Sequence, residues 1–234
     1  MRISTLLGAG LATLVAGAAT ADITGAYVYE YSVTASDFDG SAVTVNIQDL
    51  YLSSDNGADV ALNVFNYSAS DTAADSYFQS FTGTGWQPTN LGGPFDTPAL
   101  RLADSFVTIG GFAQDTLLPE QAPGTGTGSA LDPDFGGNDT GHPDENAGWY
   151  NGSPPSYAGA TGQVADGTGG FDTGVLIGRF AYQGDFTIVD STLWVTWNQG
   201  LGTPGQQSPF IVTPAPGALA LLGLAPFARR RRRH

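Results

Sequence analysis

Hydrophobic and polar residues alternate with a period of two along much of the chain. Tyr27, Tyr29, Tyr31 and Val33 share one face of the extended segment 27–34. The same pattern, rich in valine, isoleucine, threonine and aromatic residues, recurs in further segments: 43–48, 60–65, 77–81, 100–109, 175–182 and 186–197. Such alternation is typical of half-buried β-strands.

Turn-forming pairs separate these segments: Asp39-Gly40, Asn56-Gly57, Gly110-Gly111 and Gly184-Asp185. Between residues 22 and 213 no stretch of ten or more residues shows convincing helical periodicity. The pattern predicts an all-β fold of seven to nine strands. An antiparallel β-sandwich, jelly-roll-like or immunoglobulin-like, is favoured because a parallel sheet would need crossover helices.

Residues 119–173 interrupt this pattern with a long stretch rich in glycine, aspartate and proline. Structureless loops longer than about 15 residues are uncommon in compact domains. Trp149, Tyr150 and Tyr157 also set the stretch apart from disordered segments, which are poor in aromatic residues. We therefore expect an ordered insertion that connects two strands.

The first 21 residues have the features of a secretory signal peptide. Met1-Arg2 supplies a short charged start, and an apolar stretch covers residues 6–18. Ala19-Thr20-Ala21 then matches the small-residue pattern that signal peptidase recognises. The alternative is a buried N-terminal helix. We expect cleavage between Ala21 and Asp22, and a mature domain that spans residues 22–213.

The last 21 residues form a second targeting segment, 214–234. Pro214-Ala215-Pro216-Gly217 leads into an apolar run, 218–228, which five arginines end: Arg229, Arg230, Arg231, Arg232 and Arg233. A short apolar segment followed by a basic cluster predicts a membrane stop signal with the arginines on the cytoplasmic side. The segment 215–228 would span about 21 Å as a helix. The hydrocarbon core is about 30 Å thick, so we expect a transient anchor.

This tail resembles the C-terminal sorting signal of the PEP-CTERM family. The resemblance lies in Pro214, Pro216, Gly217, the run 219–224 and the arginine cluster, about a tenth of the chain. It departs at Ala215, where the family motif has glutamate, and at Pro226, which interrupts the helix. The resemblance implies processing by an exosortase-type transpeptidase and delivery to the cell envelope of a bacterium.

The predicted mature domain is strongly acidic. It contains all 22 acidic residues of the chain but only two basic residues, Arg101 and Arg179, so its net charge is −20. Such a surface repels nucleic acid and anionic lipid. The chain has no cysteine, which excludes disulfides and thiolate metal sites. We expect both arginines to be structural and to pair with carboxylates, for which bidentate geometry is specific.

One stretch of the insertion is dense in oxygen donors and is a candidate calcium site. The candidate ligands are Asp132, Asp134, Asn138, Asp139 and Asp144. The EF-hand spacing fails here, because Gly136 and Pro143 occupy ligand positions. The alternative is a solvated acidic loop without a metal.

Catalytic motifs are weak in this chain. His142 is the single histidine of the predicted mature domain, which excludes Cys-His catalysis and multi-histidine zinc sites. No G-x-S-x-G motif surrounds any serine. Paired carboxylates for glycoside hydrolysis remain open among so many acidic residues. We expect a protein that is not an enzyme.

The four tryptophans are candidates for stacking on sugar rings. Trp86 and Trp149 fall in predicted loops and are the better candidates, with packing beneath the loops as the alternative. Trp194 and Trp197 are three residues apart in a predicted strand, so they point to opposite faces and one should be buried.

Together these patterns predict an exported, non-enzymatic protein of the cell surface or extracellular matrix, with a structural or adhesive role. Its expected partners are signal peptidase, an exosortase-type transpeptidase, the inner membrane and an exopolysaccharide, with no cofactor except the candidate calcium. The alternative is a calcium-assisted carbohydrate-binding β-sandwich, and a third possibility is a glycoside hydrolase that uses paired carboxylates.

Overall fold

A computed structural model describes residues 22–36, 42–70, 86, 103–110, 129–131, 146–152 and 159–217. The expected N-terminal targeting helix lies outside these residues, as do residues 218–234 of the C-terminal targeting segment and the predicted strand 77–81. Ten strands form the described part: β1 (Ile23–Ser36), β2 (Ala42–Ser54), β3 (Val60–Ser68), β4 (Phe106–Val107), β5 (Ser129–Leu131), β6 (Ala147–Asn151), β7 (Gly162–Ala165), β8 (Phe171–Tyr182), β9 (Thr192–Asn198) and β10 (Gln206–Pro214). Within these ranges, no helix has the length and apolar character needed to cross a bilayer.

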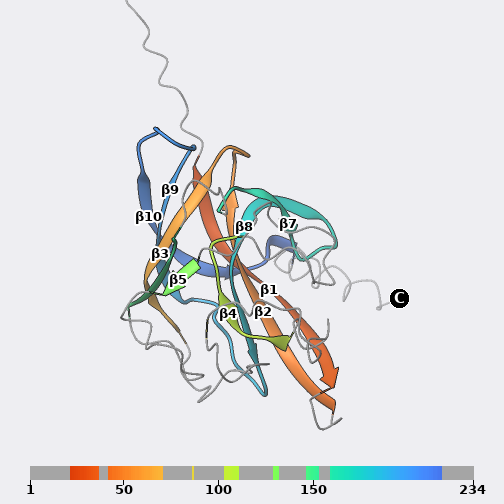
Figure 1. Ribbon diagram of the computed structural model, residues 1–234. Helices are drawn as coiled ribbons and strands as arrows, with labels where there is room; N and C mark the ends of the chain where they lie inside the picture. The colour runs from red at the N-terminus through yellow and green to blue at the C-terminus, as the bar shows by residue number, and fades with distance from the viewer. Residues whose placement is uncertain are drawn as a thin grey trace, which may run out of the picture.

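The strands form a single mixed sheet that is nearly closed into a barrel (Figure 1). Their order is β4-β8-β2-β1-β10-β9-β3-β6-β5, and β7 pairs with β8 beside this path. The two halves of the sheet meet in the interior, where the ring of Tyr67 on β3 stacks on Phe180 of β8 with centroids 5.8 Å apart. The all-β class predicted from the periodicity is confirmed.

The prediction of an antiparallel sandwich needs correction, because β1 and β10 pair in parallel. Ala26 lies opposite Val212, and Val28 lies opposite Pro214. A parallel pair requires a long connection between its strands. Here the strands are the first and last of the described sheet, so nearly the whole domain serves as that connection and no crossover helix is needed. The other described pairings are antiparallel.

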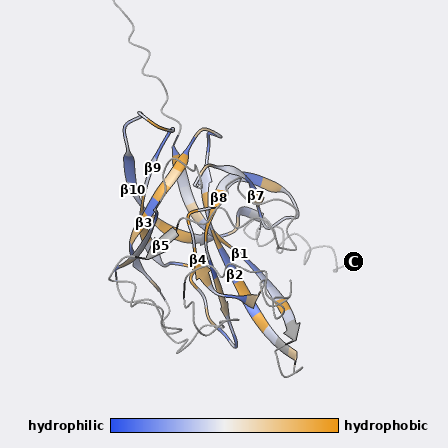
Figure 2. Ribbon diagram, viewed as in Figure 1, coloured by the Kyte–Doolittle hydropathy of each residue, from blue (hydrophilic) through white to orange (hydrophobic). Residues whose placement is uncertain are grey.

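The longest strands follow the period-two pattern of the sequence. Segments 27–34, 43–48, 60–65 and 175–182 lie within β1, β2, β3 and β8, as predicted. Figure 2 shows hydrophobic and hydrophilic positions alternating along the β1–β2 hairpin. Elsewhere the predicted strands are too long: β4 covers only two residues of 100–109, and β9 begins at Thr192 rather than Phe186.

The predicted insertion 119–173 is shorter than expected, because part of it belongs to the sheet. β6 pairs with β3, placing Trp149 opposite Val64, and β7 pairs with β8. β8 itself begins at Phe171. β6 and β7 are short and contain glycine, so each one has too few alternating residues to be recognised locally. Long-range pairing rather than local propensity makes them strands.

Large aromatic side chains fill the core. Tyr27 and Tyr51 stack with centroids 5.5 Å apart, and Tyr67 contacts the edge of Trp149 at 5.8 Å. A smaller cluster lies near the end of the β1–β2 hairpin and consists of Val33, Val45, Ile47, Ala103 and Ala181. Burying a large aliphatic or aromatic side chain contributes about 1.5–3 kcal/mol, so these clusters are the main source of stability.

Candidate functional site

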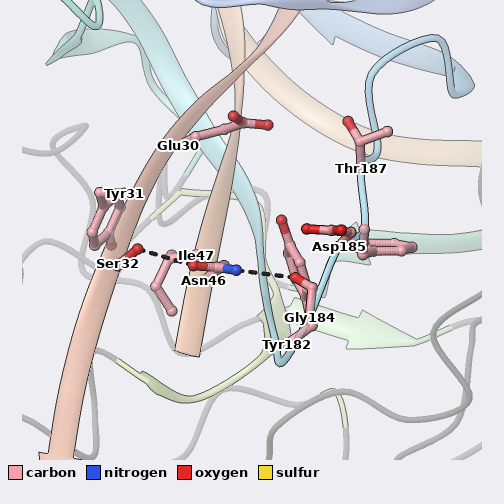
Figure 3. Close-up of a pocket in the computed structure, with 10 residues that line it drawn as sticks. Glu30, Tyr31, Ser32, Asn46, Ile47, Tyr182, Gly184, Asp185 and Thr187 are labelled. Carbon is pink, nitrogen blue, oxygen red and sulfur yellow. Dashed lines mark hydrogen bonds between the residues drawn. The ribbon is translucent and has the colours of Figure 1, made fainter. Parts of the chain in front are cut away.

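A polar groove lies where the β1–β2 hairpin passes the loop that follows β8 (Figure 3). Its volume is about 650 Å³. Strands β1 and β2 form one wall, and residues 182–187 form the other. The lining side chains include carboxylates, hydroxyls, an amide and aromatic rings: Glu30, Asn46, Tyr182, Asp185, Phe186 and Thr187.

The alternation of β1 explains why this wall is polar. Tyr29 and Tyr31 point toward buried clusters, so Glu30 and Ser32 point to the opposite, solvent-exposed face. Ser32 lies opposite Asn46 of β2, and its hydroxyl donates to the Asn46 amide oxygen at 2.9 Å. The amide nitrogen of Asn46 then donates to the carbonyl of Gly184 at 3.0 Å. One side chain therefore ties the hairpin to the opposite wall.

A buried glutamine holds the floor of the groove. The Gln48 amide nitrogen donates to the Tyr182 hydroxyl at 2.6 Å and to the Phe186 carbonyl at 2.8 Å. Its amide oxygen accepts from the backbone N–H of Ile188 at 2.8 Å. Tyr182 and Phe186 also meet edge to face, with centroids 4.8 Å apart. A loop with this many buried contacts has a defined shape before any ligand arrives.

The wall opposite β1 depends on one glycine. Gly184 has φ +89°, a backbone conformation that L-residues rarely adopt, and it lies in the turn that reverses the chain after β8. This turn brings Asp185 and Thr187 beside the hairpin. Figure 3 shows the Glu30 and Asp185 carboxylates entering the space between β1 and the loop.

This set of groups suits a neutral ligand with many hydroxyl groups. Exposed carboxylates accept hydrogen bonds strongly, and the hydroxyl and amide groups beside them can donate or accept. Two carboxylates in a domain with a net charge of −20 would repel an anionic ligand.

The candidate calcium ligands Asp132, Asp134, Asn138, Asp139 and Asp144 lie outside the described residues, as does His142. Among the residues that the structure does describe, no group of three or more acidic or histidine side chains is arranged to hold a metal ion.

The prediction that Trp86 and Trp149 form an exposed stacking platform is wrong. Both indoles are about 1% exposed. Trp149 lies on β6, its Nε1 donates to the Thr108 carbonyl at 3.0 Å, and the Trp86 ring lies 5.4 Å from that of Phe180. Both indoles belong to the main hydrophobic core rather than to a satellite cluster beneath the loops, which was the alternative. The prediction for the other pair is confirmed, because Trp197 is buried while Trp194 is only partly buried.

Arg179 is structural, as predicted. Its Nε and Nη2 donate to the two carboxylate oxygens of Asp49 at 2.7 and 3.0 Å, and both side chains are buried. The Tyr31 hydroxyl also donates to Asp49 at 3.0 Å, and the Phe106 ring lies 5.3 Å from the guanidinium carbon. Burial by itself lowers the pKa of Arg179, but the Asp49 charge raises it above its ordinary value. Arg101, the other arginine, lies outside the described residues.

The described residues include parts of both predicted processing sites. The backbone N–H of Asp22 donates to the Asp55 carboxylate at 2.8 Å, directly before β1. At the other end, Pro214 is the last residue of β10 and Ala215 is 3% exposed. Pro214–Gly217 therefore packs against the sheet, although the sequence assigns these residues to the C-terminal targeting segment 214–234. Ala19, Ala21 and Arg229–Arg233 lie outside the described residues.

No sequence pattern identified the groove residues as a candidate site. The alternation of β1 does place Glu30 and Ser32 on a common face, which is a usable local signal. The second wall comes from residues about 150 positions later, however, and no pattern in the chain connects the two.

Comparison with known proteins gives no identification, since no family model, curated protein or solved structure matches this chain.

Proposed function

We propose that this chain is an exported, non-enzymatic protein of the bacterial cell surface or extracellular matrix, with a structural or adhesive role. The observation that carries the proposal is its pair of targeting segments, an N-terminal apolar stretch with a cleavage pattern and a C-terminal apolar run ended by five arginines. Signal peptidase would remove the first segment. An exosortase-type transpeptidase would remove the second after transient anchoring in the inner membrane.

The start of the folded domain supports this proposal. β1 begins at Ile23, one residue after the expected mature N-terminus. The backbone of Asp22 already pairs with Asp55, because the Asp55 N–H donates to the Asp22 carbonyl at 3.4 Å and the Asp22 N–H donates to the Asp55 carboxylate. Cleavage before Asp22 would therefore remove no residue of the sheet.

Intact-mass analysis of the protein from envelope and medium fractions of a native host tests the proposal. We expect a species that begins at Asp22 and lacks Arg229–Arg233. Replacing the five arginines with serines should release the precursor, because the stop signal depends on their charge. A mature species that keeps the arginines, or unchanged membrane retention of the serine variant, would refute the sorting route.

The groove favours a specific adhesive function, the binding of a neutral polysaccharide. Glu30 and Asp185 offer charged acceptors to sugar hydroxyls, and the buried hydrogen bonds of Gln48 hold the opposing walls in place. Removing one charged hydrogen-bond partner costs about 1.5–3 kcal/mol, which is roughly a tenfold or larger loss of affinity. The net charge of −20 on the domain argues against nucleic acid as a partner, because it repels the phosphate backbone.

Retention on a column of neutral polysaccharide tests this function. Glu30→Gln and Asp185→Asn should each elute early, while Asp190→Asn, an exposed acid outside the groove, should behave as wild type. Equal retention of all variants would refute binding in the groove. Repeating the column with a calcium chelator tests the alternative of a calcium-assisted module, because loss of retention would indicate that the candidate ligands between residues 132 and 144 hold calcium. Release of reducing sugar from the polysaccharide would indicate a glycoside hydrolase instead.

A further inference from the structure

The chain does not leave the domain at the end of β10 but continues along β1. The backbone N–H of Ala215 donates to the Val28 carbonyl at 2.9 Å, which extends the parallel β1–β10 pairing. The N–H of Gly217 donates to the Asp166 carbonyl at 3.2 Å, in the turn between β7 and β8. Two backbone hydrogen bonds therefore hold the segment Pro214–Gly217, with Ala215 and Gly217 both buried.

The packing between this segment and the β7–β8 turn leaves no free space. A Cβ atom added to Gly167 would lie 2.7 Å from the Ala215 methyl group, and Gly167 also has φ +81°. A Cβ added to Gly217 would collide with the Thr168 side chain and lie 2.8 Å from its backbone nitrogen. Contacts under 3 Å force atoms to move, so each glycine is needed for the close approach.

The turn is itself held in one shape by Asp166. Its Oδ1 accepts from the Thr168 N–H at 2.7 Å, from the Thr168 hydroxyl at 2.8 Å and from the Gly170 N–H at 3.0 Å. A turn with these side-chain hydrogen bonds presents a fixed surface to Ala215 and Gly217. The segment therefore fits against a rigid partner.

We propose that Pro214–Gly217 is a folded clasp that shields the junction with the C-terminal tail, so that the processing enzyme reaches this junction only when the clasp opens. A peptidase binds its substrate chain in an extended, accessible form. In Pro214–Gly217 that form is not available, because Ala215 and Gly217 are buried and their backbone N–H groups are hydrogen-bonded to β1 and to the β7–β8 turn. The cleavage rate is then limited by the fraction of molecules with an open clasp.

The proposal also gives a physical reason for Ala215. Its side chain contacts the β7–β8 turn in the closest packing that the turn allows. The glutamate that the family motif has at this position would bury a charged carboxylate beside the turn that contains Asp166, at a large cost. The residue at 215 is therefore set by the fold of the domain as well as by the processing enzyme.

Hydrogen exchange and processing, both measured on the full chain, test the clasp. In the wild type, the amides of Ala215 and Gly217 should exchange as slowly as other β10 amides. Gly167→Ala, which lies outside the sorting motif and would place a Cβ 2.7 Å from the Ala215 methyl group, should speed the exchange of both amides while β1 and β2 keep their protection, which serves as the control for folding. Gly57→Ala is the matched control, because a Cβ at Gly57 meets no atom within 4 Å. Rapid exchange of Ala215 and Gly217 in the wild type would refute the clasp.

Pulse-chase labelling in a native host then measures tail removal. This arm rests on the proposed sorting route. Gly167→Ala precursor should lose its tail about tenfold faster than wild type or Gly57→Ala, the change expected if the clasp loses about 1.4 kcal/mol of stability. Equal rates for the three chains would refute the role of the clasp. A wild type that is never processed refutes the sorting route, and the exchange result alone then decides whether the clasp exists.

Discussion

The Asp49–Arg179 ion pair links the central strands β2 and β8, and its removal should be costly. Replacing Arg179 by methionine keeps most of the side-chain volume but leaves the buried Asp49 carboxylate with the Tyr31 hydroxyl as its remaining side-chain donor among the described residues. The change also removes the guanidinium from the face of the Phe106 ring. The perturbation therefore acts on charge compensation more than on packing.

The magnitude follows from the cost of an uncompensated buried charge. Breaking a buried pair by removing one partner costs about 3–5 kcal/mol. For a domain of roughly 150–250 residues, each kcal/mol lowers Tm by about 2–4 °C, so we expect a loss of about 6–20 °C. The double variant Asp49→Asn with Arg179→Met removes both charges and keeps an oxygen that can accept from Tyr31. It should be more stable than Arg179→Met alone.

Urea and thermal unfolding of the purified chains, followed by circular dichroism, measure these differences. Asp190→Asn serves as the control, because this residue is exposed and asparagine tolerates its φ of +68° as well as aspartate does. Its stability should change by less than about 0.5 kcal/mol. The reasoning is refuted if Arg179→Met is no less stable than this control, or if the double variant loses as much as the two single variants combined.

Three further predictions concern the ends of the sheet and its core. Cleavage before Asp22 converts the backbone nitrogen that contacts Asp55 into an ammonium group, and the pKa of this group should rise above the usual value of about 7.7–8.0. The stability that this contact adds is then present below about pH 8 and lost as the pH rises through the pKa of the folded state. Thermal melts of Asp55→Asn should show no such loss. Burial raises the pKa of Asp59, hydrogen bonds from Ser54 and Gln199 lower it, and the Asp55 and Asp22 carboxylates raise it again, with a net rise. The contribution of Asp59 to stability is therefore most favourable below its unfolded pKa of about 3.9 and becomes less favourable as the pH rises. Asp59→Asn should stabilise the protein in melts at pH 7 but not at pH 3. Trp149→Ala should cost about 3–5 kcal/mol in urea unfolding, because the indole is a core side chain, and a near-neutral result would contradict its burial.

The local pattern of this chain predicts the long strands β1, β2, β3 and β8, but it misses β10, which has nine residues. Alternation with period two marks β1, β2 and β3, whereas β8 is an apolar run that is buried on both faces from Gly174 to Tyr182. The short strands could not be predicted in this way. β6 has five residues, and it becomes a strand because its backbone pairs with β3, more than 80 residues earlier in the chain.

The sequence by itself therefore determined the all-β class and the −20 charge of residues 22–213, and it predicts a targeting role for both ends, because these are properties of composition and local order. Only the tertiary structure decided which strands are neighbours. The parallel β1–β10 pair, in which the Thr213 hydroxyl donates to the Ala26 carbonyl at 3.2 Å, joins residues 187 positions apart. That pairing buries Ala215 in the domain, and the pairing of β6 with β3 buries Trp149. Periodicity shows which face of a strand is buried but not which other strands pair with it or pack against it. Both the groove and the clasp depend on this pairing and packing.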